Sequence, residues 1–487
     1  MRGSGWIVRR LAQGVAVLVA LLSTAASGAG VSSADRIHAD SASATRGKTA
    51  AASAKPSIVL ILTDDQRWDT LSWMPNVERL LVDKGVTFTH AFVPNSLCCP
   101  SRTTVITGKY SHSTGVWSNG GQYGGFPSFH QEGSTIATWL HQAGYHTALV
   151  GKFLNQYAKA AHQGYVPPGW DRWNAFAGDN GAYYDYDLTL NGHIVHHGHT
   201  AADYSTDVLT NKATQFIRQT AGPLFLYFAP TAPHDPFTPA PQDANGCANL
   251  APYRPPSFGE PDVSDKPGYV RDIRWTSRSA GQAGWTRRSQ CRSLIDVDRS
   301  VARIVASLEA THRLSTTMLV FMSDNGYMWG EHRLFAKPFP YEEDSRVPLV
   351  VRYDPLTGTP RKEGRIALNL DLAPTFAALA GVGAPGAEGR NLLPVIRGQK
   401  VPWRTDFLLE HGKVVQPVLV SAPDYCGLHS LRWVYVMYST GAEELYDLRS
   451  DPYQLTNVAR RPSAQDQRKR MRARVLSWCR PLPPGFR

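Results

Sequence analysis

Hydrophobic residues along the chain follow two patterns, which predict alternating strands and helices. Short unbroken apolar runs are typical of strands that are buried on both faces of a parallel sheet. Such runs occur within 55–65 and at 146–150, 224–228, 318–322 and 347–353. Segments 134–144 and 294–310 carry apolar residues at helical spacing instead. This alternation predicts an α/β fold, with a large, mostly parallel sheet and helices on both of its faces.

The pattern changes after Gly381, where proline, glycine and loop residues become frequent. Shorter alternating runs within 406–448 then predict a small antiparallel sheet. We therefore expect a large domain over 56–395 and a C-terminal subdomain over 396–487. The subdomain is expected to pack on the large domain and to form part of the wall of its cleft.

Residues 1–30 have the pattern of a secretory signal peptide, because arginines precede an apolar run at 11–22 and small residues follow it. The run is shorter than the roughly 20 residues that span a bilayer, and no other segment approaches that length, so we expect no stable membrane span. An uncleaved anchor remains the alternative, and the choice between Sec and twin-arginine export stays open. Residues 31–55 are rich in Ala, Ser and Thr and predict a flexible lead-in. The expected location is extracellular.

The formal net charge is +11, which suits an anionic partner but also describes a solvated basic surface. The densest basic run, 468–474, is interpreted as an exposed helix. No zinc-finger spacing and no aromatic-glycine RNA signature is present, so a nucleic-acid partner is not expected.

Export permits disulfides, and the chain has six cysteines. Four of them form two sets of neighbours in the sequence, and we expect Cys247 to pair with Cys291 and Cys426 with Cys479. Three pairings of four cysteines are possible.

Oxygen-bearing side chains follow two of the predicted strands. Asp64 and Asp65 end the first apolar run, and Asp324 and Asn325 follow the run at 318–322. In parallel sheets, functional sites gather beyond the carboxyl ends of the strands. Oxygen-only ligation favours Ca²⁺ or Mg²⁺. Either pair alone is more often a turn or a helix cap, but two pairs at the ends of buried strands favour a metal site.

The stretch Asn95–His112, "NSLCCPSRTTVITGKYSH", predicts a short helix. Pro100 suits its first position, Ser101–Thr107 its body, and Cys98 the position just before it. A group at Cys98 would then face the free N–H groups of a helix N-terminus, which favour anions. Arg102, in the first turn, could reach back as a fixed cation.

These residues resemble a known family. "SLCCPSR" at 96–102, followed by "VITG" at 105–108, is similar to the first signature of the type I, formylglycine-dependent sulfatases, and "GYHT" through "VGKF" at 144–153 is similar to the second. The resemblance extends from about 57 to 459 and includes "RVPLVV", "DLAPT" and "LYDLRSDPYQLTNVA". It implies an alkaline-phosphatase-like fold for the large domain.

The resemblance also implies a mechanism. In that family a formylglycine-generating enzyme reads Leu-Cys-x-Pro-x-Arg, and Leu97, Cys98, Pro100 and Arg102 supply each element of that code. The aldehyde formed from Cys98 is hydrated, and one hydroxyl attacks the sulfur of a sulfate ester while the alcohol leaves. The other hydroxyl then loses its proton and expels sulfate.

The resemblance assigns the remaining roles by motif position. The metal, with Ca²⁺ favoured over Mg²⁺, is held by Asp64, Asp65, Asp324, Asn325 and residue 98. Lys152 and Lys337 bind the sulfate, and Arg102 belongs to the same catalytic set. His234 is the first choice for protonating the leaving group.

One position bears on the substrate. Many arylsulfatases have a histidine where this chain has Leu154, and "GKFLNQY" with "GYVPPGWDRW" is instead closest in form to the N-acetylglucosamine-6-sulfatases and heparan 6-O-endosulfatases. We therefore favour a sulfated amino sugar or a glycosaminoglycan. The alternatives are a general arylsulfatase, a phosphate or phosphonate ester hydrolase, and a non-catalytic carbohydrate-binding protein.

Overall fold

The computed structural model describes residues 55–178, 181–413 and 420–486. The predicted signal peptide, and all of the predicted lead-in except Lys55, lie outside the described residues. Within the described ranges, no helix is long and apolar enough to cross a membrane.

A ten-stranded sheet forms the centre of the large domain. Its strands, in spatial order, are β13 (Arg361–Glu363), β2 (Val86–Phe88), β12 (Leu349–Arg352), β9 (Thr317–Ser323), β1 (Ser57–Thr63), β8 (Leu224–Ala229), β4 (His146–Gly151), β5 (Arg172–Phe176), β6 (Tyr186–Leu190) and β7 (His193–His197). The five central strands from β9 to β5 are mutually parallel. The mostly parallel sheet is thus confirmed, but the predicted strand at 347–353 forms as β12 and runs antiparallel to β9.

Strand β1 shows why these residues form a central strand. Ile58, Leu60 and Leu62 enter one apolar cluster, and Val59 and Ile61 enter another, so successive side chains pack on opposite faces. All five are at most 1% exposed. Burial of each such side chain is worth about 1.5–3 kcal/mol, which makes a strand with two apolar faces stable only between two layers of helices.

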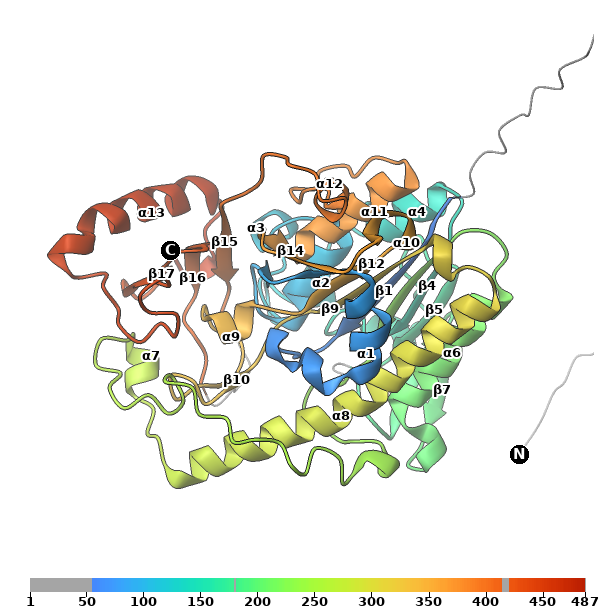
Figure 1. The fold of residues 1–487 in the computed structure, drawn as a ribbon, viewed down its shortest axis with the longest axis horizontal. Helices are drawn as coiled ribbons and strands as arrows, with labels where there is room; N and C mark the ends of the chain where they lie inside the picture. Colours follow the sequence, from blue (N-terminus) through green and yellow to red (C-terminus); the bar gives the residue numbers. More distant parts are fainter. Residues whose placement is uncertain (1–54, 179–180, 414–419, 487) are drawn as a thin grey trace, which may run out of the picture. The chain divides into compact units, whose positions relative to one another are not determined.

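Helices cover both faces, as Figure 1 shows. The apolar residues of α1, α6 and α8 belong to one cluster, and those of α2, α4 and α11 belong to the other. The helices are α1 (Pro75–Leu80), α2 (Cys98–Thr107), α3 (Ser111–Thr114), α4 (Ile136–Gln142), α5 (Ala158–His162), α6 (Ser205–Gln219), α7 (Gly268–Arg271), α8 (Ser277–Ala310), α9 (Glu342–Ser345), α10 (Asp354–Thr357), α11 (Leu372–Ala380), α12 (Leu393–Ile396) and α13 (Gln465–Trp478). Two short pairs, β10 (Met328–Trp329) with β11 (Phe335–Ala336) and β3 (Ala91–Phe92) with β14 (Ala367–Leu368), lie outside the main sheet.

Two predicted helices differ in their boundaries. The helix expected at 294–310 begins at Ser277, because Thr276 forms a capping box with Ser279 well before the apolar stripe starts. The segment predicted at 134–144 forms α4 only from Ile136 to Gln142, and its cap is Thr135, since the Thr135 side chain accepts a hydrogen bond from the Thr138 amide.

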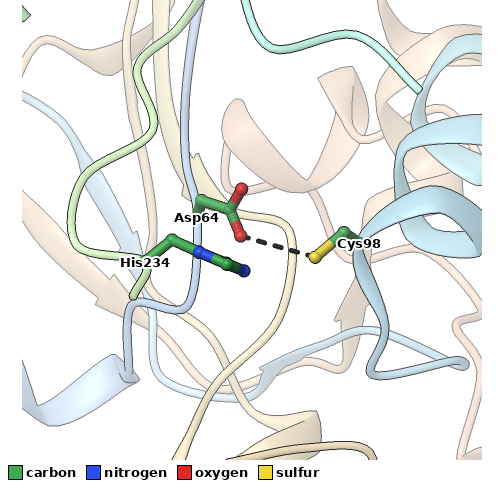
Figure 2. Close-up of side chains that lie close together, drawn as sticks. All are labelled: Asp64, Cys98 and His234. Carbon is green, nitrogen blue, oxygen red and sulfur yellow. Dashed lines mark hydrogen bonds between the residues drawn. The ribbon is translucent and has the colours of Figure 1, made fainter. Parts of the chain in front are cut away.

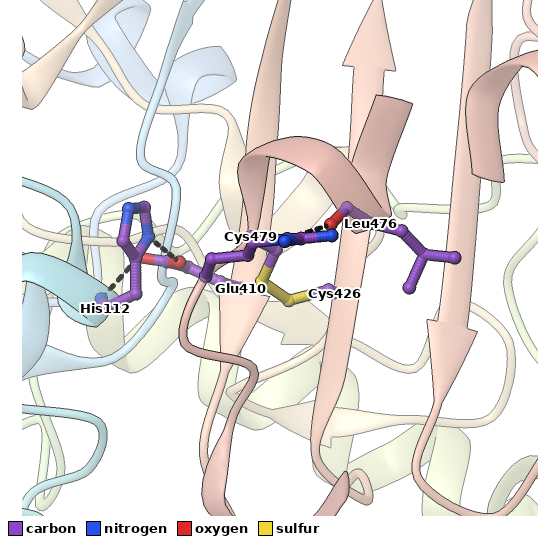
Figure 3. Close-up of a disulfide and its surroundings, with 6 residues drawn as sticks. His112, Glu410, Cys426, Leu476 and Cys479 are labelled. Atoms are coloured by element: carbon purple, nitrogen blue, oxygen red, sulfur yellow. Dashed lines mark hydrogen bonds and ion pairs between the residues drawn. A yellow bond between two sulfur atoms is a disulfide. The ribbon is translucent and has the colours of Figure 1, made fainter. Parts of the chain in front are cut away.

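The C-terminal residues form the expected antiparallel sheet, from β15 (Asp406–His411), β16 (Tyr425–Ser430), β17 (Trp433–Tyr438) and β18 (Glu443–Asp447). Both predicted disulfides are confirmed, and Cys426–Cys479 joins β16 to the residue after α13 (Figure 3). His112 of α3 contacts Glu410 of β15, with Nδ1 2.7 Å from Oε2. The apolar cluster beneath this sheet includes Phe92 of the large domain. The division at 395/396 stays a prediction.

Two glycines at opposite ends of β4 provide a test of backbone packing. Gly151 has φ +119°, and a Cβ there would lie 2.0 Å from the Ala229 carbonyl oxygen, whereas Gly144 has φ +82° and nothing within 4 Å of a Cβ. We expect Gly144→Ala to lower the free energy of unfolding by about 1 kcal/mol, for backbone strain alone. Gly151→Ala should cost about 3 kcal/mol or more, because β4 must also move away from β8. Chemical denaturation measures both, and equal losses would contradict the close approach.

Candidate active site

The site begins where two neighbouring strands end. β1 and β9 pair in parallel with Thr63 opposite Ser323, so the residues that follow both strands emerge at the same edge of the sheet. The Asp324 amide donates to the Thr63 carbonyl at 3.1 Å, and the Asp65 amide donates to Asp324 Oδ1 at 3.2 Å. The backbone itself therefore holds the carboxylates together.

Three carboxylates converge at this edge. Oxygens of Asp64, Asp65 and Asp324 lie within 4.8 Å of one another, and each residue is at most 2% exposed. Asn325 donates to Asp65 Oδ1 at 2.6 Å. Buried carboxylates are costly unless cations and hydrogen bonds compensate them, so this corner requires positive charge.

Arg102 and Lys152 supply part of that charge. Arg102 Nε lies 2.8 Å from Asp324 Oδ2, its Nη2 lies 3.3 Å from Asp64 Oδ2, and its Nη1 donates to the Lys152 carbonyl at 2.9 Å. The Lys152 ammonium, just past the end of β4, contacts the same Asp64 carboxylate. Burial alone would raise the pKa of Asp64, but Lys152, His234 and Lys337 together hold that pKa well below its usual range.

Lys337 follows β11 and points its ammonium into the predicted ligand set. It contacts Asp65, and its Nζ lies 3.5 Å from Asp64 Oδ1, 3.4 Å from Asn325 Oδ1 and 2.7 Å from Cys98 Sγ. Four of the five predicted metal ligands thus surround the Lys337 ammonium. The donor set fits a hard divalent cation, since nearly all its atoms are carboxylate or amide oxygens.

The helix that carries Cys98 begins earlier than expected. α2 starts at Cys98 itself, after Leu97 in an extended conformation, and Pro100 occupies the third helical position instead of the first. Proline is tolerated there because the first N–H groups of a helix have no intrahelical partner. The sequence suggests free N–H groups at this helix end. The amide of Cys99, however, donates to Asn119 Oδ1 at 2.8 Å, so this N–H group is not free to bind an anion. Asn119, in a glycine-rich stretch, carried no sequence signal for this contact.

The two adjacent cysteines face different surroundings. Cys98 Sγ lies 3.5 Å from Asp64 Oδ1, whereas Cys99 belongs to an apolar cluster beside the sheet. Burial raises the pKa of Cys99 to about 12, which makes it inert at neutral pH. Both thiols are free of disulfides. Successive helical residues point about 100° apart, which explains the separation.

His234 closes the group from the loop after β8. Figure 2 shows it beside Asp64 and Cys98, and ligand atoms of these three residues lie within 4.8 Å of one another. Its Nδ1 bonds the Asp235 carbonyl at 2.7 Å, which leaves Nε2 facing Asp65 at 3.9 Å. Burial disfavours the charged ring, but Asp64 and Asp65 outweigh it and raise the pKa of His234 to about 9. The His234 side chain is 19% exposed and lies at the mouth of the site.

All the residues predicted for the site are therefore brought together. Leu154 is buried in an apolar cluster, and His332 pairs with Glu260, with Nδ1 2.6 Å from Oε2. Neither joins the group around Cys98.

Comparisons with known proteins agree with the predicted family. The family model for sulfatases matches residues 56–382, and the model for the C-terminal domain of N-sulphoglucosamine sulphohydrolase matches 330–480. The chain is 33% identical to human N-acetylglucosamine-6-sulfatase over 457 residues, which cover 84% of this chain and 82% of that protein.

Two further matches differ in coverage. The chain is 34% identical over 385 residues to a Drosophila melanogaster extracellular sulfatase SULF-1 homolog, covering 75% of this chain but only 34% of that protein. The fold is similar, with a TM-score of 0.77 and 23% identity, to BT4656 solved in complex with its substrate D-glucosamine-2-N,6-O-disulfate. That match covers 87% of this chain and 97% of the solved one.

The carboxylate corner predicts that Ca²⁺ stabilises the protein. After EDTA treatment, we expect Ca²⁺ at a hundredfold excess over its Kd to add roughly 3 kcal/mol to the free energy of unfolding. Asp324→Asn should lose most of this gain, because one of three converging carboxylates is gone. Asp466→Asn, which removes an exposed carboxylate on α13, is the matched control. Thermal melting with and without Ca²⁺ measures the effect, and an undiminished Ca²⁺ response in Asp324→Asn would place the ion elsewhere.

Proposed function

Because the chain belongs to the sulfatase family, whose members are sulfuric ester hydrolases, we propose that it removes 6-sulfate groups from N-acetylglucosamine-type sugars of glycosaminoglycans. The observation that carries this substrate is the 33% identity to human N-acetylglucosamine-6-sulfatase over most of both chains. Leu154, in place of the histidine of many arylsulfatases, supports the same choice.

Residue 98 acts, in this proposal, as formylglycine. The Cys98 Sγ atom, between Asp64 and Lys337, marks the place that the aldehyde-derived oxygens would take. The recognition code at Leu97, Cys98, Pro100 and Arg102 is buried in the folded chain. A formylglycine-generating enzyme must therefore read it before this segment packs.

A divalent cation, with calcium favoured, would be held by Asp64, Asp65, Asp324 and Asn325 together with residue 98. When bound, it would lower the pKa of a hydroxyl group and neutralise sulfate oxygens. Lys152 and Lys337 carry ammonium groups on either side of Asp64, where they can hold the oxygens of a bound sulfate. Arg102 keeps the carboxylates in place from within α2. Fixed cations of this kind are worth most where negative charge develops on the leaving oxygen.

His234 protonates the leaving alcohol. Its Nε2 faces the site, its Nδ1 is fixed by the Asp235 carbonyl, and its exposed edge lies where the sugar would enter.

Secretion is part of the proposal. It is supported by the sequence pattern at 1–30, by the two disulfides, and by a relative named as an extracellular sulfatase.

Substrate assays test the function. The mature enzyme should give a higher kcat/KM on N-acetylglucosamine 6-sulfate than on an aryl sulfate or an aryl phosphate, because relatives that match most of the chain are named as N-acetylglucosamine-6-sulfatases. Cys98→Ala serves as the blank for contaminating hydrolases. A preference for the aryl sulfate would overturn the amino-sugar substrate, and a preference for the phosphate would overturn the sulfatase activity.

Cysteine variants test the mechanism. Cys98→Ala should abolish turnover and leave the fold intact, whereas Cys99→Ala should keep most activity and lose about 1 kcal/mol of stability for a small cavity. Mass spectrometry of the tryptic peptide that contains residue 98 should show an aldehyde, lighter than the thiol because oxygen replaces sulfur and two hydrogens are lost. Activity in Cys98→Ala, or an inactive Cys99→Ala, would show that the nucleophile is assigned wrongly.

A further inference from the structure

A cleft of about 730 Å³ opens beside the site. Its lining includes Asp235 and Ala336, which are the chain neighbours of His234 and Lys337, so the cleft lies beside these two catalytic residues. Its outer part is lined by residues of the segment before α8 and of the first turns of α8. Figure 1 shows this half of α8, in yellow-green, running past β10. The volume lies within the range of about 300–1,000 Å³ that is typical of sites enclosing a sizeable ligand.

Aromatic rings connect the carboxylate corner to the surface of α8. Tyr327 and Phe237 line the cleft and pack edge to face, with their ring centroids 6.0 Å apart. Phe237 packs in the same way against Trp285, with 5.9 Å between the ring centroids. Phe237 is only 3% exposed, whereas Trp285 is 47% exposed. An exposed indole at the outer end of a row of buried rings offers a flat apolar face to a ligand that leaves the cleft.

One face of α8 presents this indole together with polar groups. Arg278, Gln282 and Trp285 are spaced i, i+4 and i+7, so they lie on the same side of the helix, over about 10 Å of its length. Arg278 and Gln282 also line the cleft.

The charge on this surface is not neutralised locally. The segment 271–292 contains six arginines and one aspartate. Arg274 and Arg278 line the cleft and are exposed, and within the described residues neither forms an ion pair with an acidic side chain. Arg333, also in the lining, donates to the carbonyls of Glu260, Ile273 and Pro261, at 2.9, 3.2 and 2.8 Å, and forms no ion pair within the described residues. The lining holds only Asp235 and Asp272 as opposing charges.

The basic run at 468–474 behaves differently. In α13, Arg468 and Arg472 pair with Glu443, and Arg474 pairs with Asp406. Three of the five basic residues of this run are therefore paired with carboxylates. The cleft arginines Arg274 and Arg278 instead keep their charge available for an anionic ligand.

We infer that this cleft and the exposed face of α8 bind the sulfated sugar residues that flank the hydrolysed one, so that the substrate is an oligosaccharide chain. The inference rests on the proposed function for the site itself. Arg274 and Arg278 would contact sulfate or carboxylate groups of the chain, since a guanidinium bonds such anions in a fork. Trp285 would stack against the apolar face of a sugar ring.

Steady-state kinetics on two substrates tests the inference. For the double variant Arg274→Ala/Arg278→Ala, we expect KM for a heparin octasaccharide to rise about tenfold, and kcat/KM for N-acetylglucosamine 6-sulfate to stay within about twofold. Trp285→Ala should raise the octasaccharide KM about threefold and also leave the monosaccharide unaffected. The octasaccharide KM should rise with salt more steeply for the wild type than for the arginine variant.

The control removes the same two charges elsewhere. Lys469→Ala/Arg470→Ala removes two exposed charges on α13 and should change neither the octasaccharide KM nor the monosaccharide kcat/KM. The inference is overturned if this control raises the octasaccharide KM as much as the arginine variant does. It is equally overturned if the arginine variant lowers kcat/KM for both substrates by the same factor. It is also overturned if a single-stranded oligonucleotide of equal charge competes as well as the octasaccharide.

Binding separates this inference from the proposed function. Calorimetry with the octasaccharide in a Cys98→Ala background needs no turnover. An enzyme that cleaves aryl sulfate but no amino-sugar sulfate would refute the proposed substrate, and a tenfold loss of octasaccharide affinity in the arginine variant would still support the cleft. Equal affinity with and without the two arginines would refute the cleft, whatever the assays show.

Discussion

The convergence of Asp64, Asp65 and Asp324 is the constraint on which the rest of the site depends. Parallel pairing of β1 with β9 places three buried carboxylates within 4.8 Å of one another, and like charges so close cannot all stay ionised without compensation. Cations from three different parts of the chain provide this compensation: Arg102 on α2, Lys152 after β4 and Lys337 after β11. That requirement explains why segments so distant in sequence meet at one edge of the sheet.

The same cations suit a sulfate. In our proposal Asp64, Asp65, Asp324 and Asn325 would hold a divalent ion that neutralises the carboxylates, and the two ammonium groups would then have an anion of the substrate as their partner. The two lysines would thus serve two purposes in turn, first compensating the carboxylates and then binding the sulfate. Arg102 differs from the lysines, because its three contacts, with Asp324, Asp64 and the Lys152 carbonyl, fix it as part of the framework.

The parts of the structure that could be predicted from the sequence are those with a local signal. Buried parallel strands such as β1 and β9 are unbroken apolar runs, and the residues directly after them are read from the same stretch. Three helix boundaries could not be predicted: the start of α8 at Ser277, the cap of α4 at Thr135 and the start of α2 at Cys98. In each case several neighbouring positions satisfy the same local rules. The contact of Asn119 with the Cys99 amide joins residues whose sequence gives no reason to expect them together. The antiparallel direction of β12 likewise depends on its partner β9 and not on its own residues.

The density of basic residues along the sequence did not reveal which charges remain unpaired in the folded protein. The run at 468–474 has the most basic residues per turn, but Glu443 and Asp406 of the neighbouring sheet form ion pairs with it. Both acids lie outside the run in the sequence, so the run itself does not reveal these pairs. The arginines around the start of α8 are more widely spaced, and helical periodicity brings Arg278 onto the face of Trp285 without an acidic neighbour. What a basic surface can bind depends on which charges remain unpaired after folding, and these are found only when the partners contributed by other elements are known. Here the unpaired arginines line the cleft beside His234 and Lys337. In our inference, a polyanionic chain lies along this cleft to present one of its sulfates to the site.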